Sequence, residues 1–346
     1  MKQRQSNIEL LRCLLMLMIV IIHFLGHNIL SAANPIDINN PHFYTANLLL
    51  AFCECAVDCF VLISGWFLIN FSIRKIIMFL LPIAFYQFVI SCVYYPYGGN
   101  ISISPFHYWF VPPFIALMIL SPVINKALKN ISKKKLQIIL IFLTLIFILP
   151  IQSLSGMYGK NAFIFIYIYC LGFYLKNHFD NKYSMVFYLS FFLISVLLIF
   201  AETVVLGKTG HYEGTRTLSY SYDNILIIFA AVFLLLFFSK LEFQSNVINK
   251  ISLSAFFVYI ITENENIYGN NNYSIYKILD VQSWETNNMF ILKIIGASIM
   301  LFSIAILIDI TRRFIFQKPE KFLSEKINVL EQKISDIENG TINKPE

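Results

Sequence analysis

The sequence predicts an all-α integral membrane protein with about ten transmembrane helices and with both termini in the cytoplasm. Of its 346 residues, 58% are hydrophobic, only 13% are charged and 34 are phenylalanine. Soluble domains have about a quarter of their residues charged. The first apolar run holds charged residues at depth and is followed by many similar runs, which is unlike a cleavable signal peptide. The membrane is therefore expected to be the permanent solvent of this chain.

Apolar windows long enough to cross the hydrocarbon core as helices recur along the chain. The shortest are the fifth and the sixth, and the ninth carries acidic residues at its outer end. We place the ten spans at residues 8–30, 47–69, 76–96, 108–125, 136–151, 161–176, 184–206, 223–239, 250–266 and 290–316.

Basic residues fall mainly in alternate connections, which is an orientation signal. The connections that share a side with the two termini hold most of them, and the others hold few. The formal charge of +6 is thus explained by topology, and we expect no nucleic-acid partner. The basic residues on the side of the termini include Arg74, Lys75, Lys126, Lys129, 133–135, Lys176, Lys182, Lys240 and Lys250.

Two parts of the chain differ in composition. Residues 1–317 form the expected membrane core, and residues 318–346 form a polar cytoplasmic tail. Apolar residues of the tail alternate four and three apart, which is heptad spacing over roughly two repeats. This spacing is compatible with a short coiled coil that joins two copies as a homodimer, with an amphipathic helix on the membrane, or with a frayed tail.

All six cysteines lie within predicted spans, where thiols behave as small apolar residues. Three of them, Cys53, Cys55 and Cys59, lie close together, but their spacing matches no zinc pattern. We therefore expect neither a metal nor a bound cofactor.

The first span carries Arg12, His23 and His27, and ionisable residues at membrane depth indicate function. Arg12 and His23 are eleven residues apart, about 20° past three full turns, so they share one helix face. His23 lies roughly 16 Å beyond Arg12, near mid-bilayer, and His27 follows one turn further out.

The second span runs back toward the cytoplasm and carries Glu54 and Asp58, four residues apart and hence on one face. Counted inward from the end of the span, Asp58 comes at about the depth of His23 and Glu54 near that of His27. A carboxylate beside an imidazole makes it a better base. Helix-to-helix hydrogen bonding is the structural alternative, but the convergence of these five groups favours a catalytic site.

Four segments resemble the membrane acyltransferase 3 family. They are NIELLRCLLMLMIVIIH in the first span, DCFVLISGWFL in the second, YWFVPPFIALMILSPVIN in the fourth and INKISLSAFFVYII in the ninth. The similarity runs from about residue 7 to residue 262. The resemblance implies an enzyme that takes an acyl group, most often acetyl, from acyl-CoA in the cytoplasm and places it on a hydroxyl of a glycan.

The resemblance also implies roles for residues. His23 takes the role of catalytic base and Arg12 that of donor contact, with Ser64 and Gly65 in the family's Ser-Gly motif. Many members carry two arginines spaced R-x-x-R before a proline-containing helix, whereas here Arg74 and Lys75 are adjacent. Lysine does not replace a bidentate arginine, so the donor role of these two residues departs from the pattern.

Three residues are candidates on the acceptor side: His27, His107 and Trp109. An aromatic residue at the start of a span is often only an interfacial anchor, but sugar rings also stack on tryptophan. The expected partners are acyl-CoA, a glycan or its lipid-linked precursor, and the bilayer of a bacterial-type inner or plasma membrane. A proton-coupled glycan transporter and a polysaccharide polymerase are the alternatives, and neither explains the Arg-x10-His and Ser-Gly motifs together.

Overall fold

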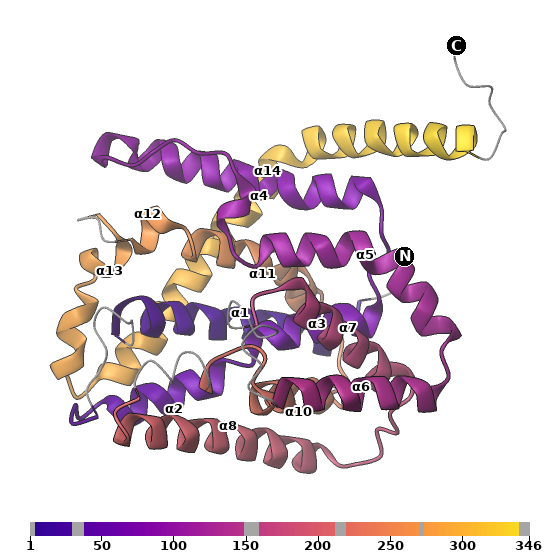
Figure 1. Cartoon of the computed structure of the whole chain (residues 1–346). Helices are drawn as coiled ribbons and strands as arrows, with labels where there is room; N and C mark the ends of the chain where they lie inside the picture. The colour runs from indigo at the N-terminus through magenta and orange to yellow at the C-terminus, as the bar shows by residue number, and fades with distance from the viewer. Residues whose placement is uncertain (1–3, 30–37, 149–158, 212–218, 270–272, 339–346) are drawn as a thin grey trace.

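The computed structural model is a bundle of helices in the residues it describes, which are 4–29, 38–148, 159–211, 219–269 and 273–338. Strands are absent from these ranges. Figure 1 shows most long helices lying roughly along one common direction, with α1 in the middle and α2 and α8 along one side. The elements are α1 (Ser6–Phe24), η1 (Leu25–Ile29), α2 (Phe43–Cys53), α3 (Ala56–Phe67), α4 (Ile73–Tyr94), η2 (Tyr95–Tyr97), η3 (Pro105–His107), α5 (Val111–Asn130), α6 (Lys133–Ile148), α7 (Ala162–Asn177), α8 (Met185–Lys208), α10 (Ile225–Ser239), α11 (Asn246–Thr262), α12 (Glu265–Tyr268), α13 (Ile275–Ile278), η5 (Val281–Thr286) and α14 (Phe290–Glu338).

Each predicted span corresponds to a helix or, for the second, to the pair α2 and α3. Six helical segments among the described residues are long and apolar enough to cross a membrane, and α7, α10 and α11 are shorter apolar helices. The chain is thus an all-helical, multi-pass membrane protein. Whether all ten segments span the bilayer, and which end faces the cytoplasm, stay predictions.

Several of these helices begin with an N-cap residue whose side chain accepts hydrogen bonds from backbone N–H groups of the first turn. The Ser72 hydroxyl accepts a hydrogen bond from the backbone N–H of Lys75 at the start of α4, and Asn161 accepts two at the start of α7. Such caps satisfy N–H groups that have no partner within the helix. At the other end of a helix, Leu68 has φ +60° and so terminates α3.

Polar contacts show which ends of the helices lie together. The Ser6 hydroxyl donates to Asn249 Oδ1 at 3.0 Å, where α1 and α11 begin. His23 Nδ1 lies 3.0 Å from Thr262 Oγ1, where both helices end. Helices α1 and α11 therefore run parallel and side by side. We call the end that holds Ser6 the N-terminal end of the bundle and the end that holds His23 the far end.

Helices α3 and α7 approach closely at two glycines. A Cβ atom on Gly65 would lie 2.0 Å from the backbone oxygen of Tyr169, and one on Gly172 would lie 2.2 Å from that of Leu62. Real Cβ atoms do not come this close to backbone, so both positions exclude larger residues. In membrane helices small residues let backbones pack in this way.

Buried polar contacts join α4 and α14. The Tyr86 hydroxyl donates to Asp309 Oδ1 at 2.9 Å, and Arg312 Nε donates to the same oxygen at 2.8 Å. Arg312 also pairs with Glu320. Burial of an ionised group costs free energy unless the group is paired. The contacts of Asp309 and Arg312 with each other and with their neighbours offset that cost.

The segment after residue 317 continues α14 as far as Glu338. It runs alongside the start of α4 (Figure 1), where Arg74 Nη1 donates to Ser324 Oγ at 3.2 Å and the Arg74 backbone N–H donates to Glu331 Oε1 at 3.1 Å. Part of the tail therefore packs on its own chain. The homodimer through this tail stays a prediction, and residues 339–346 lie outside the described part.

Candidate active site

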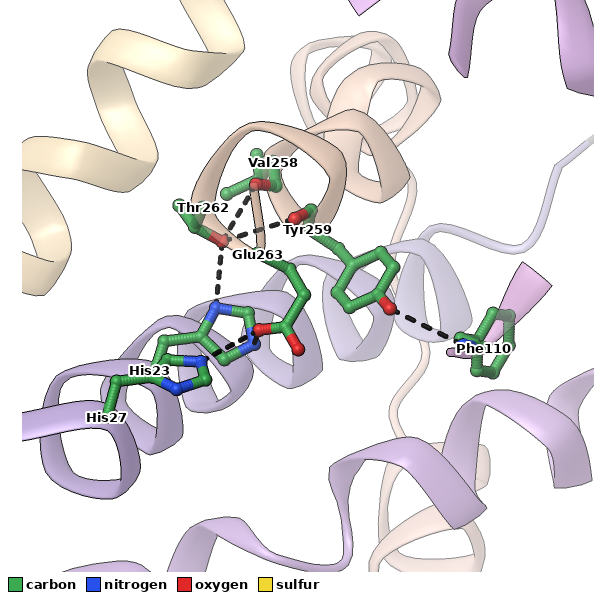
Figure 2. A network of polar contacts seen from close by, with 7 residues as sticks. All are labelled: His23, His27, Phe110, Val258, Tyr259, Thr262 and Glu263. Carbon is green, nitrogen blue, oxygen red and sulfur yellow. Dashed lines mark hydrogen bonds and ion pairs between the residues drawn. The ribbon is translucent and has the colours of Figure 1, made fainter. Parts of the chain in front are cut away.

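Two histidines and one glutamate meet at the far end of the bundle. His23 Nε2 lies 2.9 Å from Glu263 Oε2, and His27 Nε2 lies 3.0 Å from the same oxygen. The side chain of His23 is 7% exposed, that of Glu263 14% and that of His27 26%. Figure 2 shows both rings on one side of α1, with the Glu263 carboxylate reaching across from the end of α11. The exposure rises from His23 to His27, so the pair has a buried and a more accessible side.

The local helix geometry sets this arrangement. His23 belongs to the last turn of α1, and His27 belongs to η1, a π-helical segment that continues it. Single π-helical turns within α-helices are often found at functional sites. Helix α11 ends at Thr262, and Glu263 is the residue that follows its last turn. The parallel packing of α1 and α11 thus brings the ends of both helices together.

When both imidazole rings are neutral, one placement of their protons satisfies every contact of His23. An ionised Glu263 accepts a hydrogen bond from the Nε2–H of His23 and from that of His27. The lone pair of His23 is then on Nδ1, which faces Thr262 Oγ1 at 3.0 Å. The Thr262 hydroxyl has one proton, for which Nδ1 competes with the Val258 carbonyl oxygen at 2.9 Å. In this pattern Nδ1 is the basic nitrogen and Glu263 stabilises the charge that protonation creates.

Aromatic side chains surround the two rings. Tyr268 stacks on His27 with ring centroids 4.0 Å apart, and Tyr259 lies 6.0 Å from His23. Burial, and then the negative charges of Glu263 and Glu265, raise the pKa of Tyr268 to about 12. Its hydroxyl is therefore neutral at physiological pH, so it places no charge beside the accessible histidine.

The expected pairing of Asp58 and Glu54 with the histidines is not what the structure shows. Glu263 takes that place, because α1 makes its most extensive contact with α11 while α3 packs mainly on α7 and α10. Asp58 is fully buried, and both of its carboxylate oxygens lack a hydrogen-bond partner within the described part of the chain. The expected contact between these carboxylates and the histidines, on which their catalytic role was based, is therefore not found in the described structure.

The expected donor contacts lie toward the N-terminal end and are engaged within the chain. Arg12 Nη1 lies 3.6 Å from Glu9 Oε2. Arg74 contacts the tail as described above, and the Lys75 ammonium group donates to the Asn70 carbonyl oxygen. These three residues do not form one cluster with His23, and their donor role stays a prediction.

The Ser-Gly motif has a packing role in this structure. The Ser64 hydroxyl donates to the Phe60 carbonyl oxygen at 3.1 Å, which keeps it within α3, and Gly65 permits the close contact with α7. A direct part of either residue in donor binding stays a prediction.

The acceptor-side candidates separate in space from one another. Trp109 stacks on Tyr222 with ring centroids 5.1 Å apart, and Lys160 Nζ lies 4.8 Å from the Trp109 ring. His107 Nε2 lies 3.1 Å from Ser102 Oγ in an exposed loop. Of the three candidates, His27 alone contacts Glu263 in the described structure.

The same three residues could also hold a metal ion. One ligand atom from each of His23, His27 and Glu263 lies within 4.8 Å of the others. Two histidines and one carboxylate form a ligand set that catalytic zinc sites use. Sequence spacing alone does not reveal this ligand set, because the carboxylate comes from a helix that is distant in the chain.

Two residues that matter here were not singled out from the sequence. Glu263 is one of the acidic residues at the outer end of the ninth expected span, and Thr262 directly precedes it. The available signal was the position of Glu263 directly after an apolar run, where a charge near membrane depth needs a partner.

The fold and this site define a multi-pass membrane protein with a buried histidine and carboxylate pair at one end of its helical bundle. A family profile described as an acyltransferase domain, the acyltransferase 3 family, matches residues 5–310. The chain belongs to this family and is a membrane acyltransferase. Comparison with curated proteins and with solved structures gave no match.

Proposed function

We propose that this protein is an O-acyltransferase that moves an acyl group, preferentially acetyl, from acyl-CoA to a hydroxyl of a cell-surface glycan or of its lipid-linked precursor. The observation that carries the proposal is the contact of 2.9 Å between His23 Nε2 and Glu263 Oε2 in a chain of the acyltransferase 3 family. Transfer to a hydroxyl needs a base that removes its proton, and a histidine supported by a carboxylate is such a base.

The proton follows a short path in this proposal. The hydroxyl oxygen of the acceptor attacks the thioester carbonyl while its proton passes to His23, directly or through the Thr262 hydroxyl at 3.0 Å. The C–S bond then breaks, and the imidazolium returns the proton to the CoA thiolate. Glu263 stabilises the imidazolium between these steps, as a carboxylate does in hydrolytic triads. The products are an O-acyl ester and free CoA thiol.

The donor and the acceptor approach from opposite ends of the bundle. Arg12, with Arg74 and Lys75, supplies positive charge toward the N-terminal end, and a donor rich in phosphate needs such contacts. His27 is the more exposed member of the histidine pair and faces the side from which a glycan would come. The expected location is the plasma membrane of a bacterial-type cell, with the N-terminal end in the cytoplasm.

The test is release of free CoA thiol from acetyl-CoA by the purified protein in nanodiscs. We expect release that depends on an added pool of lipid-linked glycan, together with acetyl ester on that glycan. His23→Ala is expected to lower the rate by about two to four orders of magnitude, because it removes the base, and to leave the protein folded in the nanodisc.

Two outcomes would contradict the proposal. Full activity of His23→Ala would show that another group is the base. Absence of thiol release from the wild-type protein with every acyl donor and glycan tried would favour the proton-coupled transporter or the polymerase, neither of which consumes acyl-CoA.

A further inference from the structure

A cavity of about 490 Å³ opens at the N-terminal end of the bundle, far from the histidine pair. It is lined by the start of α1, the ends of α3 and α7, and the segment that follows α10. The Asn7 side chain, which lines it, donates to the Phe238 carbonyl oxygen at 3.1 Å, and this contact joins α1 to the end of α10. The cavity is thus built from four helices that are fixed to one another.

A tryptophan and a lysine dominate the chemistry of this cavity. Lys176 Nζ lies 4.6 Å from the centroid of the Trp66 ring, which is a cation–π contact. Trp66 is only 7% exposed, and its indole N–H is buried without a hydrogen-bond partner in the described structure. A buried donor without an acceptor costs free energy. A ligand that brings an acceptor to this site would remove that cost.

The two side chains are held in register by the glycine contact between their helices. Trp66 follows Gly65, and Lys176 lies one turn after Gly172, the two glycines at which α3 and α7 meet backbone to backbone. The indole and the ammonium group are therefore positioned by packing, as a binding site requires.

A ligand for this site must bring an anionic acceptor. An indole N–H and an ammonium group are both donors, and phosphate oxygens accept from both. The amides of Gln5 and Gln244 also line the cavity and suit a polar group such as a base or a sugar. Glu242 lines it as well but is exposed, so its carboxylate can turn to water.

We propose that this cavity binds the phosphate-bearing end of a ligand, and that the ligand is the adenosine phosphate end of the acyl-CoA donor. The second part rests on the proposed function. Asn7, in the cavity, and His23 lie sixteen residues apart on one helix, roughly 24 Å along its axis. A donor anchored at one end and reacting beside His23 needs a long linear arm, and CoA carries its thioester at the end of the pantetheine arm.

The test is equilibrium binding of labelled 3′,5′-ADP, the nucleotide end of CoA, to the full-length protein in nanodiscs. Lys176→Met keeps the apolar stem and removes the charge, and Trp66→Phe keeps an aromatic ring and removes the donor. Each is expected to weaken binding roughly tenfold or more, because a hydrogen bond to a charged group is lost. Lys129→Met, an exposed lysine at the same end that does not line the cavity, serves as the matched control and is expected to bind normally.

A second arm distinguishes the CoA donor from a phospholipid. Native mass spectrometry of the same proteins, in nanodiscs that contain phosphatidylglycerol, reports retained anionic lipid. Loss of retained lipid in both variants with unchanged 3′,5′-ADP binding would support the phosphate site and assign it to a lipid headgroup. Unchanged nucleotide binding and unchanged lipid retention in both variants would overturn the proposal.

The outcome is separable from that of the proposed function. His23→Ala is expected to bind 3′,5′-ADP as the wild type does while it loses transfer. Normal transfer with an unchanged KM for acetyl-CoA in both cavity variants would refute the CoA assignment and leave the acyltransferase proposal intact. If the wild type binds 3′,5′-ADP but transfers no acyl group, the nucleotide site is supported and the acyltransferase proposal is refuted.

Discussion

His23 Nε2 lies 2.9 Å from Glu263 Oε2, and this contact joins the first helix of the chain to the end of α11. The glutamate also contacts His27 at 3.0 Å, so one carboxylate holds two imidazole rings. Because the group is mostly buried, the attraction between an imidazolium and this carboxylate is stronger than it would be in water. In the proposed reaction Glu263 therefore stabilises the charge that His23 carries while it holds the proton of the acceptor hydroxyl.

The first prediction concerns the charge of Glu263. Glu263→Gln keeps the size of the side chain and one oxygen, but it removes the negative charge that stabilises protonated His23. We expect the rate of acyl transfer to fall by about two to four orders of magnitude, with little change in KM for acetyl-CoA. Thiol release from acetyl-CoA in nanodiscs measures both quantities.

The matched control for this prediction is Glu265→Gln. Glu265 is exposed and begins the short helix α12 only two residues later, so loss of its charge is expected to leave the rate within about twofold. Equal losses in both variants would argue that the outer segment as a whole, rather than the contact with His23, limits the reaction.

Much of the fold could be predicted from the sequence. Long apolar runs dictate helices in a bilayer, because each backbone N–H and C=O must be satisfied within its own segment. Each expected span accordingly falls on a helix or helix pair. What the runs do not encode is which helices are neighbours, and they do not fix the residue at which each helix ends. The ninth helix, for example, ends at Thr262 and not at 266 as expected.

The same limit explains the outcome at the site. Helical periodicity placed Arg12, His23 and His27 within one helix, since only local geometry is involved. It could not show that α11 lies parallel beside α1 or that Glu263 completes the pair. The carboxylates expected instead, Asp58 and Glu54, match the histidines in expected depth, but it is Glu263 that contacts both histidines in the structure. The sequence of one helix indicates how deep a residue lies in the membrane, but a contact between side chains also depends on which helix packs beside it.

The second prediction concerns the contact between α3 and α7. Gly65→Ala places a Cβ atom 2.0 Å from the Tyr169 backbone oxygen, so the two helices must separate. We expect a loss of about 1–3 kcal/mol of stability or more, seen as a lower midpoint of thermal unfolding in detergent.

Gly296→Ala is the control for this substitution. Gly296 lies in the long helix α14, and a Cβ atom there meets nothing within 4 Å. Alanine favours helix over glycine, so this variant is expected to be unchanged or slightly more stable. A stable Gly65→Ala protein with normal α3 packing would contradict the close contact.

The third prediction separates an acid–base site from a metal site. His23, His27 and Glu263 could hold a metal ion, but the proposed mechanism uses His23 as a base and needs none. We therefore expect transfer to be unchanged after dialysis against a strong chelator, and metal analysis of the active protein to give less than one equivalent of zinc. Loss of activity on chelation, with recovery on addition of zinc, would replace the base mechanism by a metal-activated hydroxyl.

The last prediction concerns Thr262. Its hydroxyl lies 3.0 Å from His23 Nδ1 and is fully buried, so it orients the ring and lies where a proton would pass to the basic nitrogen. Thr262→Val keeps the shape of the side chain and removes the hydroxyl, and we expect kcat to fall by about tenfold or more, because a hydrogen bond that holds the base is lost. Thr262→Ser restores the hydroxyl and is expected to recover most of the rate. Steady-state thiol release at saturating acetyl-CoA measures the effect, and thermal unfolding of each variant reports any change in folding. Equal rates for the valine and serine variants would show that the hydroxyl has no part in the reaction, and His23 would then act without a positioning partner at Nδ1.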